Sequence, residues 1–489
     1  MGYCLMQGDM PAVAESVRPI TLWSLLSWSG WAAVAILFMA VPFSPLIPAV
    51  AIITLLFSAI LIFRTPLLGL YLLPLPLMIG PVLSFSISGV GNATVGDLYS
   101  IILIFRTILS RGRRLNIASH PFLLSGSVLL VFSAVFSDNP GASMVALIKI
   151  SQFALLIWVT LSLVKRPTGL YKIFASWVMV TTLCSVMLLW YLFNGQPGFL
   201  LNWASNLDLN NVVNLELGDV LFRPSFFYTN FFLPLGLSLL YALTVVLSDI
   251  EMHRGAKILL YTSIPINFVA LMLNNTRSML IPVIVLGGLT SVWYLFSKKS
   301  SYLKSILFIS VAVGGGIFMS DYLVSDSQLV LLQNRFEDSS SIDMRLSVWD
   351  SVLSKTLDDP LRILVVGWGP QATTRQSGAD IQKFLTGSRG NVEGAFDSTI
   401  IGFLVEYGFI FTTLVFVYIA RWFSRIWKLW RWTGDATVLA LLLMGIAFVF
   451  THIFQQFGIS PPALMAMQMF AFLPATGRSL RVAPIARHD

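Results

Sequence analysis

The sequence predicts an all-α integral membrane protein, a polytopic bundle of about fourteen transmembrane helices with one large extracytoplasmic helical loop. Three observations predict this fold class. Hydrophobic residues make up 56% of the 489 residues and charged residues only 11%, whereas a soluble domain is about 25% charged. The mean hydropathy is +0.80. Apolar runs of about 20 residues, the length that crosses a bilayer, recur along nearly the whole chain.

The expected spans begin at residue 23, and no cleaved leader is expected before them. The residues ahead of Trp23 carry Asp9 and Glu15 against a single arginine, whereas a secretory leader starts with a short basic region. The expected spans are 23–42, 46–63, 67–87, 96–110, 121–137, 142–164, 169–193, 225–248, 257–274, 277–296, 303–320, 397–419, 436–456 and 461–476. The fourth is the weakest, because it contains Asp97 and Arg106.

Lys and Arg in the short loops predict the orientation. Placing the N-terminus in the cytoplasm puts the basic loops on that side, while the opposite short loops contain no Lys or Arg. The chain then divides into a cytoplasmic tail (1–22), transmembrane helices 1–11 (23–320), a large periplasmic loop (321–396), transmembrane helices 12–14 (397–476) and a second cytoplasmic tail (477–489).

The net charge of +8 follows from this topology and favours contact with the lipid bilayer rather than with nucleic acid. The large loop carries seven Lys and Arg residues against ten Asp and Glu residues, so no nucleic-acid partner is expected. Cys4 and Cys184 should lie at different depths, which argues against a disulfide. The four histidines have no metal-ligand spacing, so neither a metal nor another cofactor is expected.

A few charged side chains fall within or at the ends of the apolar spans, where charge is costly and often functional. Lys149 and Glu406 lie inside spans, whereas Arg223, Arg277 and Asp397 lie at the expected outer membrane face. Lys149 lies about one-third of the way into its span from that same face, so it is a third cation near the outer surface. Three cations near one face suit a ligand that bears phosphate, which Arg binds with two hydrogen bonds. Each residue also has a structural alternative: Lys149 can pair with Glu406, and a boundary arginine can anchor a helix.

Two further stretches stand out. In the large loop, Arg345 and Trp349 share one face of a predicted helix that ends at 358–360, and an apolar run then leads into a turn at Gly367-Trp368-Gly369. After the loop, the stretch RWFSRIWKLWRW (421–432) repeats basic residues every three or four positions among aromatic ones. That pattern is typical of a helix lying at the cytoplasmic headgroup level.

Four segments, in this order, resemble the O-antigen polymerase and O-antigen ligase superfamily, which consists of bacterial membrane glycosyltransferases of the GT-C type. They are RPSFFYTN (223–230), TRS (276–278), Arg345 with Trp349 and GWG (367–369), and DS (397–398) with FLVEYG (403–408). The resemblance covers roughly residues 120–475. Ligases of this family carry a histidine where this chain has Asp397, which favours the polymerase members.

The resemblance implies a metal-independent glycosyltransferase in the bacterial inner membrane with a periplasmic active site. Its donor and acceptor would be glycans linked to undecaprenyl pyrophosphate. Arg277 and Arg223 would hold the pyrophosphate, Arg345 would lie over the site, and Asp397 would orient or deprotonate the acceptor hydroxyl. Trp349, Lys149 and Glu406 are further candidates for substrate binding. A chain-length regulator and a flippase are candidate partners.

The predicted function is therefore the polymerisation of lipid-linked repeat units into an exopolysaccharide, capsule or O-antigen. One alternative is a ligase that transfers a finished glycan to a lipid or protein acceptor. Another is a transporter or flippase of lipid-linked sugars, although internal inverted repeats, which are typical of transporters, are not evident in the sequence. A scaffold for an export machine would leave the outer cations without a role.

Overall fold

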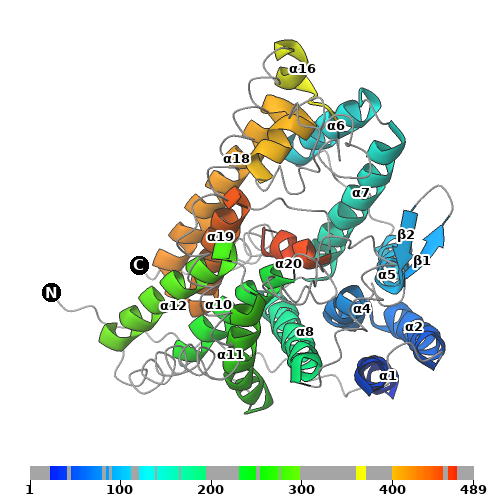
Figure 1. Ribbon diagram of the computed structural model, residues 1–489, viewed down its shortest axis with the longest axis vertical. Coiled ribbons are helices and arrows are strands. Elements are labelled where there is room, and N and C mark those ends of the chain that lie inside the picture. Colours follow the sequence, from blue (N-terminus) through cyan, green and yellow to red (C-terminus); the bar gives the residue numbers. More distant parts are fainter. Residues whose placement is uncertain are drawn as a thin grey trace, which may run out of the picture.

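The protein is a bundle of α-helices with one small β-hairpin (Figure 1). The computed structural model describes residues 22–40, 46–79, 84–87, 91–111, 121–137, 140–164, 167–193, 231–248, 254–274, 277–297, 359–369, 399–454 and 461–470. The elements before residue 200 are α1 (Leu22–Ala40), α2 (Leu46–Arg64), α3 (Pro66–Leu72), α4 (Pro74–Ile79), β1 (Ser84–Ile87), β2 (Gly91–Thr94), α5 (Val95–Arg111), α6 (Pro121–Val135), α7 (Pro140–Leu163) and α8 (Pro167–Phe193). Those after it are α10 (Phe232–Leu247), α11 (Arg254–Asn274), α12 (Arg277–Ser297), α16 (Pro360–Val365), α18 (Thr399–Thr433), α19 (Ala436–Phe454) and α20 (Pro461–Phe470).

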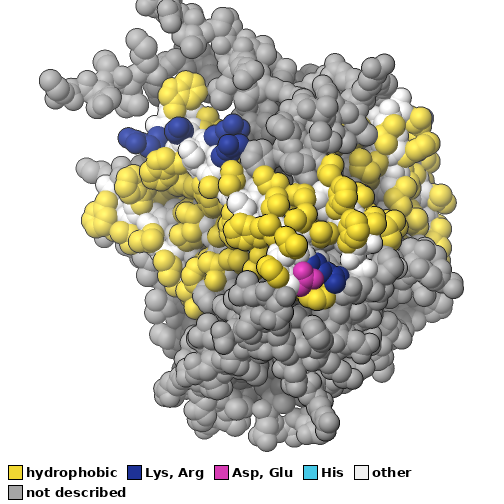
Figure 2. Space-filling model, turned by 90° about the horizontal axis from the view of Figure 1, so that it is seen from above, with side chains coloured by type: hydrophobic (Ala, Val, Ile, Leu, Met, Phe, Trp, Pro, Cys, Tyr) yellow, Lys and Arg dark blue, Asp and Glu magenta, His cyan; other side chains and the backbone are white. Residues whose placement is uncertain are grey.

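Some helices carry large aliphatic side chains on their outer side and small polar ones on their inner side, as α2 shows. On α2, Ile52 and Leu56 are 58% and 61% exposed, whereas Thr54 and Ser58 are buried and Ser58 accepts a hydrogen bond from Trp31 Nε1 at 3.0 Å. Hydrophobic side chains cover much of the described surface (Figure 2). Such a surface suits lipid rather than water. Seven helices of the described ranges are long and apolar enough to cross a membrane.

The centre of the bundle is α10, whose every residue is buried. It packs against α8, α11, α12 and α19. Polar side chains join the surrounding helices: Asn267 of α11 accepts from Ser185 Oγ at 2.9 Å and donates to Thr182 Oγ1 at 3.2 Å, both on α8. Buried hydrogen bonds of this kind link helices where lipid gives no hydrophobic driving force for association.

The predicted third span, 67–87, is wrong as a single helix. The chain forms α3 and α4, which meet at Leu73, and then the strand β1, which pairs antiparallel with β2. Pro74 and Pro76 lack the amide hydrogen that a continuous helix needs. A total of fourteen spans therefore stays a prediction, and the expected span 303–320 lies outside the described ranges.

The stretch 421–432 is not a separate interfacial helix. It continues the preceding span as α18, a helix of 35 residues whose one non-helical residue is Gly408. The all-α membrane fold class is otherwise confirmed, and most predicted spans coincide with helices to within a few residues.

Candidate functional site

Part of the predicted site can be located in the structure. Four of the predicted residues lie outside the described ranges: Arg223, Arg345, Trp349 and Asp397. Among the others, Lys149 lies in α7, Arg277 begins α12, and Glu406 lies in α18. The structure describes the backbone of Arg277 but not its side chain. Its surroundings, together with those of Lys149 and Glu406, define the candidate site.

The first feature of the site is a break in α18 at Gly408. This residue has φ 81° and ψ 172°, far from helical values. A residue with these angles interrupts the ladder of backbone hydrogen bonds, so carbonyl groups one turn earlier need other donors. Within a membrane such a break is tolerated only where neighbouring protein supplies those donors.

Two residues of the described segment 359–369 supply them. The amide of Trp368 donates to the carbonyl of Val405 at 2.7 Å, and the amide of Gly369 donates to the carbonyl of Glu406 at 3.0 Å. Two segments that are about 40 residues apart in sequence are thus joined through their backbones. We call residues 367–369 together with 405–408 the loop–helix clamp. Both halves belong to the motifs that carried the family resemblance.

The short helix α16 leads into the clamp. Asp359 accepts from the amide of Arg362 as the N-cap, and Pro360 occupies the first helical position, which are the residue types that start a helix. The sequence predicts that this Asp-Pro pair ends a helix; the structure shows it at the start of α16, and the residues before Asp359 lie outside the described ranges. The helix is six residues long and lies against α18 at the top of Figure 1.

Glycines allow the two backbones to approach. Gly367 has φ +68°, and a Cβ there would lie 2.6 Å from the carbonyl oxygen of Val405. A Cβ on Gly408 would lie 2.8 Å from the carbonyl oxygen of Ile363. Both distances are too short for a side chain, and both residues have angles that L-residues rarely adopt. Glycine at these two positions is therefore a requirement of the contact.

The end of α6 completes the clamp. Ser133 Oγ donates to the carbonyl of Glu406 at 2.7 Å. The guanidinium of Arg362 donates to the carbonyl of Phe136 at 3.3 Å and lies 4.1 Å from the ring centroid of Trp368. Arg362 thereby stacks on the turn that it helps to hold. The Glu406 side chain itself is buried, with 7% of its residue surface exposed.

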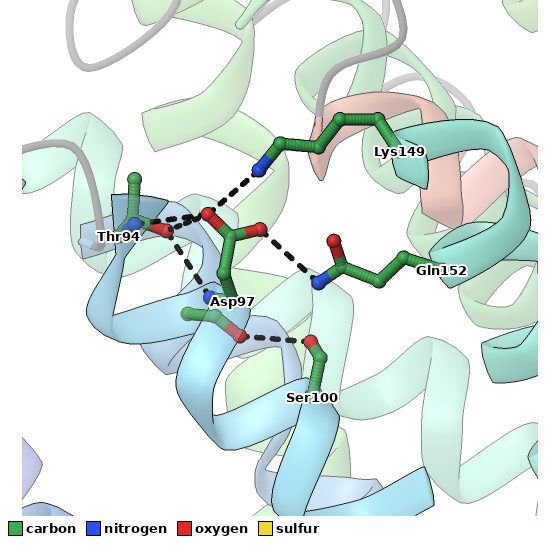
Figure 3. Close-up of polar contacts among 6 residues, drawn as sticks. Thr94, Asp97, Ser100, Lys149 and Gln152 are labelled. Carbon is green, nitrogen blue, oxygen red and sulfur yellow. Dashed lines mark hydrogen bonds and ion pairs between the residues drawn. The ribbon is translucent and has the colours of Figure 1, made fainter. Parts of the chain in front are cut away.

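Lys149 belongs to a second polar cluster (Figure 3). Its Nζ lies 2.8 Å from Asp97 Oδ2, in the first turn of α5. Asp97 also accepts from the amide and hydroxyl of Thr94 and, through Oδ1, from Gln152 Nε2 at 3.1 Å. The expected alternative of a Lys149–Glu406 pair is therefore wrong. The carboxylate of Asp97 compensates the Lys149 charge, while 32% of the lysine side chain stays exposed.

The start of α12 forms a third polar feature. Thr451 Oγ1 of α19 donates to the carbonyl of Ser278 at 3.0 Å, which joins the beginning of α12 to the last turn of α19. Ser278 Oγ is buried and has no hydrogen-bond partner among the residues that the structure describes. A buried hydroxyl normally has one. This hydroxyl follows Arg277 directly, at a helix N-terminus, where backbone amides favour anions.

Sequence reasoning missed Asp97, Ser133, Ser278 and Arg362. The cluster at Asp97 had a signal, because its carboxylate lies in a span as Lys149 does. Arg362 follows an Asp-Pro helix start, but nothing in the sequence indicates that it stacks on Trp368. No group of three or more His, Cys, Asp or Glu side chains gathers within the described ranges.

The apolar helices and the interior polar links define a multi-pass membrane protein. Residues 263–416 match the family model described as O-antigen ligase, so this part of the chain is similar to the O-antigen polymerase and ligase superfamily. The matched range runs from α11 into α18 and includes Arg277, Arg345, Asp397 and the clamp, whereas Arg223 and Lys149 lie outside it. This match supports glycan transfer of the ligase or polymerase kind. No curated protein matches the chain.

Proposed function

We propose that the protein polymerises oligosaccharide repeat units linked to undecaprenyl pyrophosphate at the periplasmic face of the bacterial inner membrane. The product would be an exopolysaccharide, a capsule or an O-antigen. In the transfer step, an acceptor hydroxyl oxygen bonds to the anomeric carbon of the donor sugar. The bond from that carbon to the pyrophosphate oxygen breaks, and the pyrophosphate carrier leaves with the bonding electron pair.

The start of α12 is the observation that carries this proposal. Arg277 stands at a helix N-terminus beside the buried hydroxyl of Ser278, which has no hydrogen-bond partner in the described part of the chain. A helix N-terminus, a guanidinium and a hydroxyl are the groups that bind phosphate oxygens. In this role Arg277, aided by Arg223, stabilises the charge that grows on the leaving pyrophosphate, which is the electrostatic contribution of fixed donors to catalysis.

The clamp supports the second half of the mechanism. Asp397 precedes Glu406 by nine positions, and Arg345 and Trp349 precede Gly367 on the other segment. Backbone hydrogen bonds join residues 368–369 to 405–406, and the proposal places Asp397, Arg345 and Trp349 around this junction, as positioning of reacting groups requires. Asp397 takes the proton of the acceptor hydroxyl, and Arg345 and Trp349 contact the substrate from the loop. Glu406 orients substrate from within the clamp.

The case for substrate binding by Lys149 is weaker than that for Arg277, because Asp97 already compensates the Lys149 charge. We assign it a contact with the neutral sugar hydroxyls of the substrate through its exposed portion. The cluster on α5 and α7 would then form one wall of the substrate path.

Ligase-type transfer is the second candidate, because the matched family model is described as O-antigen ligase. Both activities share the donor and the leaving group and differ in the acceptor. A glycan profile separates them: loss of a polymerase leaves single repeat units, whereas loss of a ligase leaves full-length chains on the carrier lipid.

The test replaces Arg277 with Gln and Asp397 with Asn, separately, in the native host, and resolves the extracted glycans on gels. We expect single repeat units without long chains in both variants. Arg254→Gln is the matched control, since Arg254 is exposed at the opposite end of α11, and it should leave the glycan unchanged. Normal chains in the two site variants would refute the assignment, and full-length chains on the carrier lipid would establish the ligase instead.

A further inference from the structure

The last turns of α18 have two distinct sides. Trp422 and Ile426 are 2% and 0% exposed and face the bundle. Arg425, Lys428 and Arg431 are exposed and follow one another at intervals of three residues. That spacing places them on one side of a helix, on successive turns. We call these three residues the basic stripe of α18.

The length of α18 places the basic stripe near a membrane boundary. Beyond its break at Gly408, α18 continues for about 25 residues to Thr433, which rise by about 37 Å at about 1.5 Å per residue, whereas the hydrocarbon core is about 30 Å thick. One end must therefore reach the headgroups. The stripe marks that end, because the rest of α18 before Arg421 carries Glu406 as its single charged residue.

The stripe is also free to take a ligand. In the part of the chain that the structure describes, none of its three cations pairs with a carboxylate. Trp427 and Trp432, which flank it, are 47% and 74% exposed. Exposed tryptophan beside cations is typical of the boundary between headgroups and acyl chains.

We propose that the basic stripe of α18 binds the headgroup of an anionic phospholipid. Arginine pairs with phosphate through two hydrogen bonds, and the lysine adds a point charge. A zwitterionic headgroup brings its own ammonium close to these cations, so the stripe discriminates against it. The tryptophans contact the glycerol and upper acyl region of the same lipid. This site is separate from the clamp and goes beyond the proposed glycan transfer.

The experiment measures how the purified full-length protein binds dioleoylphosphatidylglycerol and dioleoylphosphatidylcholine, by native mass spectrometry from detergent. The variant is Arg425→Gln with Lys428→Gln. Its matched control is Arg254→Gln with Lys257→Gln, which removes two exposed cations from the start of α11. Each headgroup cation is expected to contribute about five-fold in affinity, so the first phosphatidylglycerol should bind roughly 25-fold more weakly to the variant.

The control should change by less than about two-fold. A charge-conserving exchange, Arg425→Lys with Lys428→Arg, should retain most of the binding and shows whether a loss reflects charge rather than misfolding. Three results would overturn the proposal: wild-type protein that binds both lipids equally, equal losses in the variant and the control, or a loss in the charge-conserving exchange as large as in the variant.

Discussion

Replacing Gly367 with Ala should open the loop–helix clamp. The new Cβ would lie 2.6 Å from the carbonyl oxygen of Val405, and the residue would have to keep φ +68°. A left-handed alanine costs about 1–2 kcal/mol. Losing the two backbone hydrogen bonds from Trp368 and Gly369 costs about 0.5–1.5 kcal/mol each. The clamp is therefore expected to weaken by about 2–5 kcal/mol in total.

Amide hydrogen exchange of the protein in lipid nanodiscs measures this directly. The amides of Trp368 and Gly369 should exchange about thirty-fold faster or more, since each 1.4 kcal/mol corresponds to ten-fold. Gly434→Ala is the matched control: Gly434 has φ +63°, but a Cβ there meets nothing within 4 Å. The control carries the strain without the collision and should leave both amides unchanged. Unchanged exchange in Gly367→Ala would show that the clamp does not depend on this close approach.

Three further predictions follow from the other polar contacts. Asp97→Asn should lower the free energy of unfolding by about 1–3 kcal/mol, because it leaves the Lys149 charge without its carboxylate partner. Adding Lys149→Met should restore part of the lost stability. Thermal unfolding in detergent measures both variants, and purely additive losses would contradict the prediction. Ser133→Ala should weaken the clamp by no more than about 1 kcal/mol, because Gly369 still donates to the Glu406 carbonyl, and exchange at Gly369 that rises as much as in Gly367→Ala would be evidence against this. Gln468→Leu should destabilise the bundle by about 1–3 kcal/mol, since Gln468 accepts from Trp177 Nε1 at 2.7 Å; an unchanged melting temperature would refute it.

The sequence predicts the helices well because a bilayer imposes one simple requirement, a long apolar run, on each span. It fails where local chemistry competes with that requirement. The third span breaks at Pro74 and Pro76, although its composition is apolar. The basic end of α18 looked like a separate helix, because its composition changes at Arg421 while its backbone does not.

The candidate site could be predicted only in part. Motifs indicate Gly367-Trp368-Gly369 and Glu406 separately. Hydrogen bonds between the backbones of two distant segments produce no periodic pattern of residue types, so the sequence does not show that these two segments pair. Lys149 was recognised as a charge within a span, yet its partner is Asp97 rather than Glu406. Residue type alone does not show which of the two carboxylates, Asp97 or Glu406, lies close to Lys149 in space.

A cryo-electron microscopy map of the full-length protein in nanodiscs tests the central claim most directly, namely that Arg277, Asp397 and the clamp form one diphosphate-glycan site. We expect both side chains to line a single cavity that opens on the same membrane face as the clamp, with the Trp368 amide on the Val405 carbonyl. A map in which Arg277 and Asp397 open to opposite faces, or to separate cavities, would contradict it.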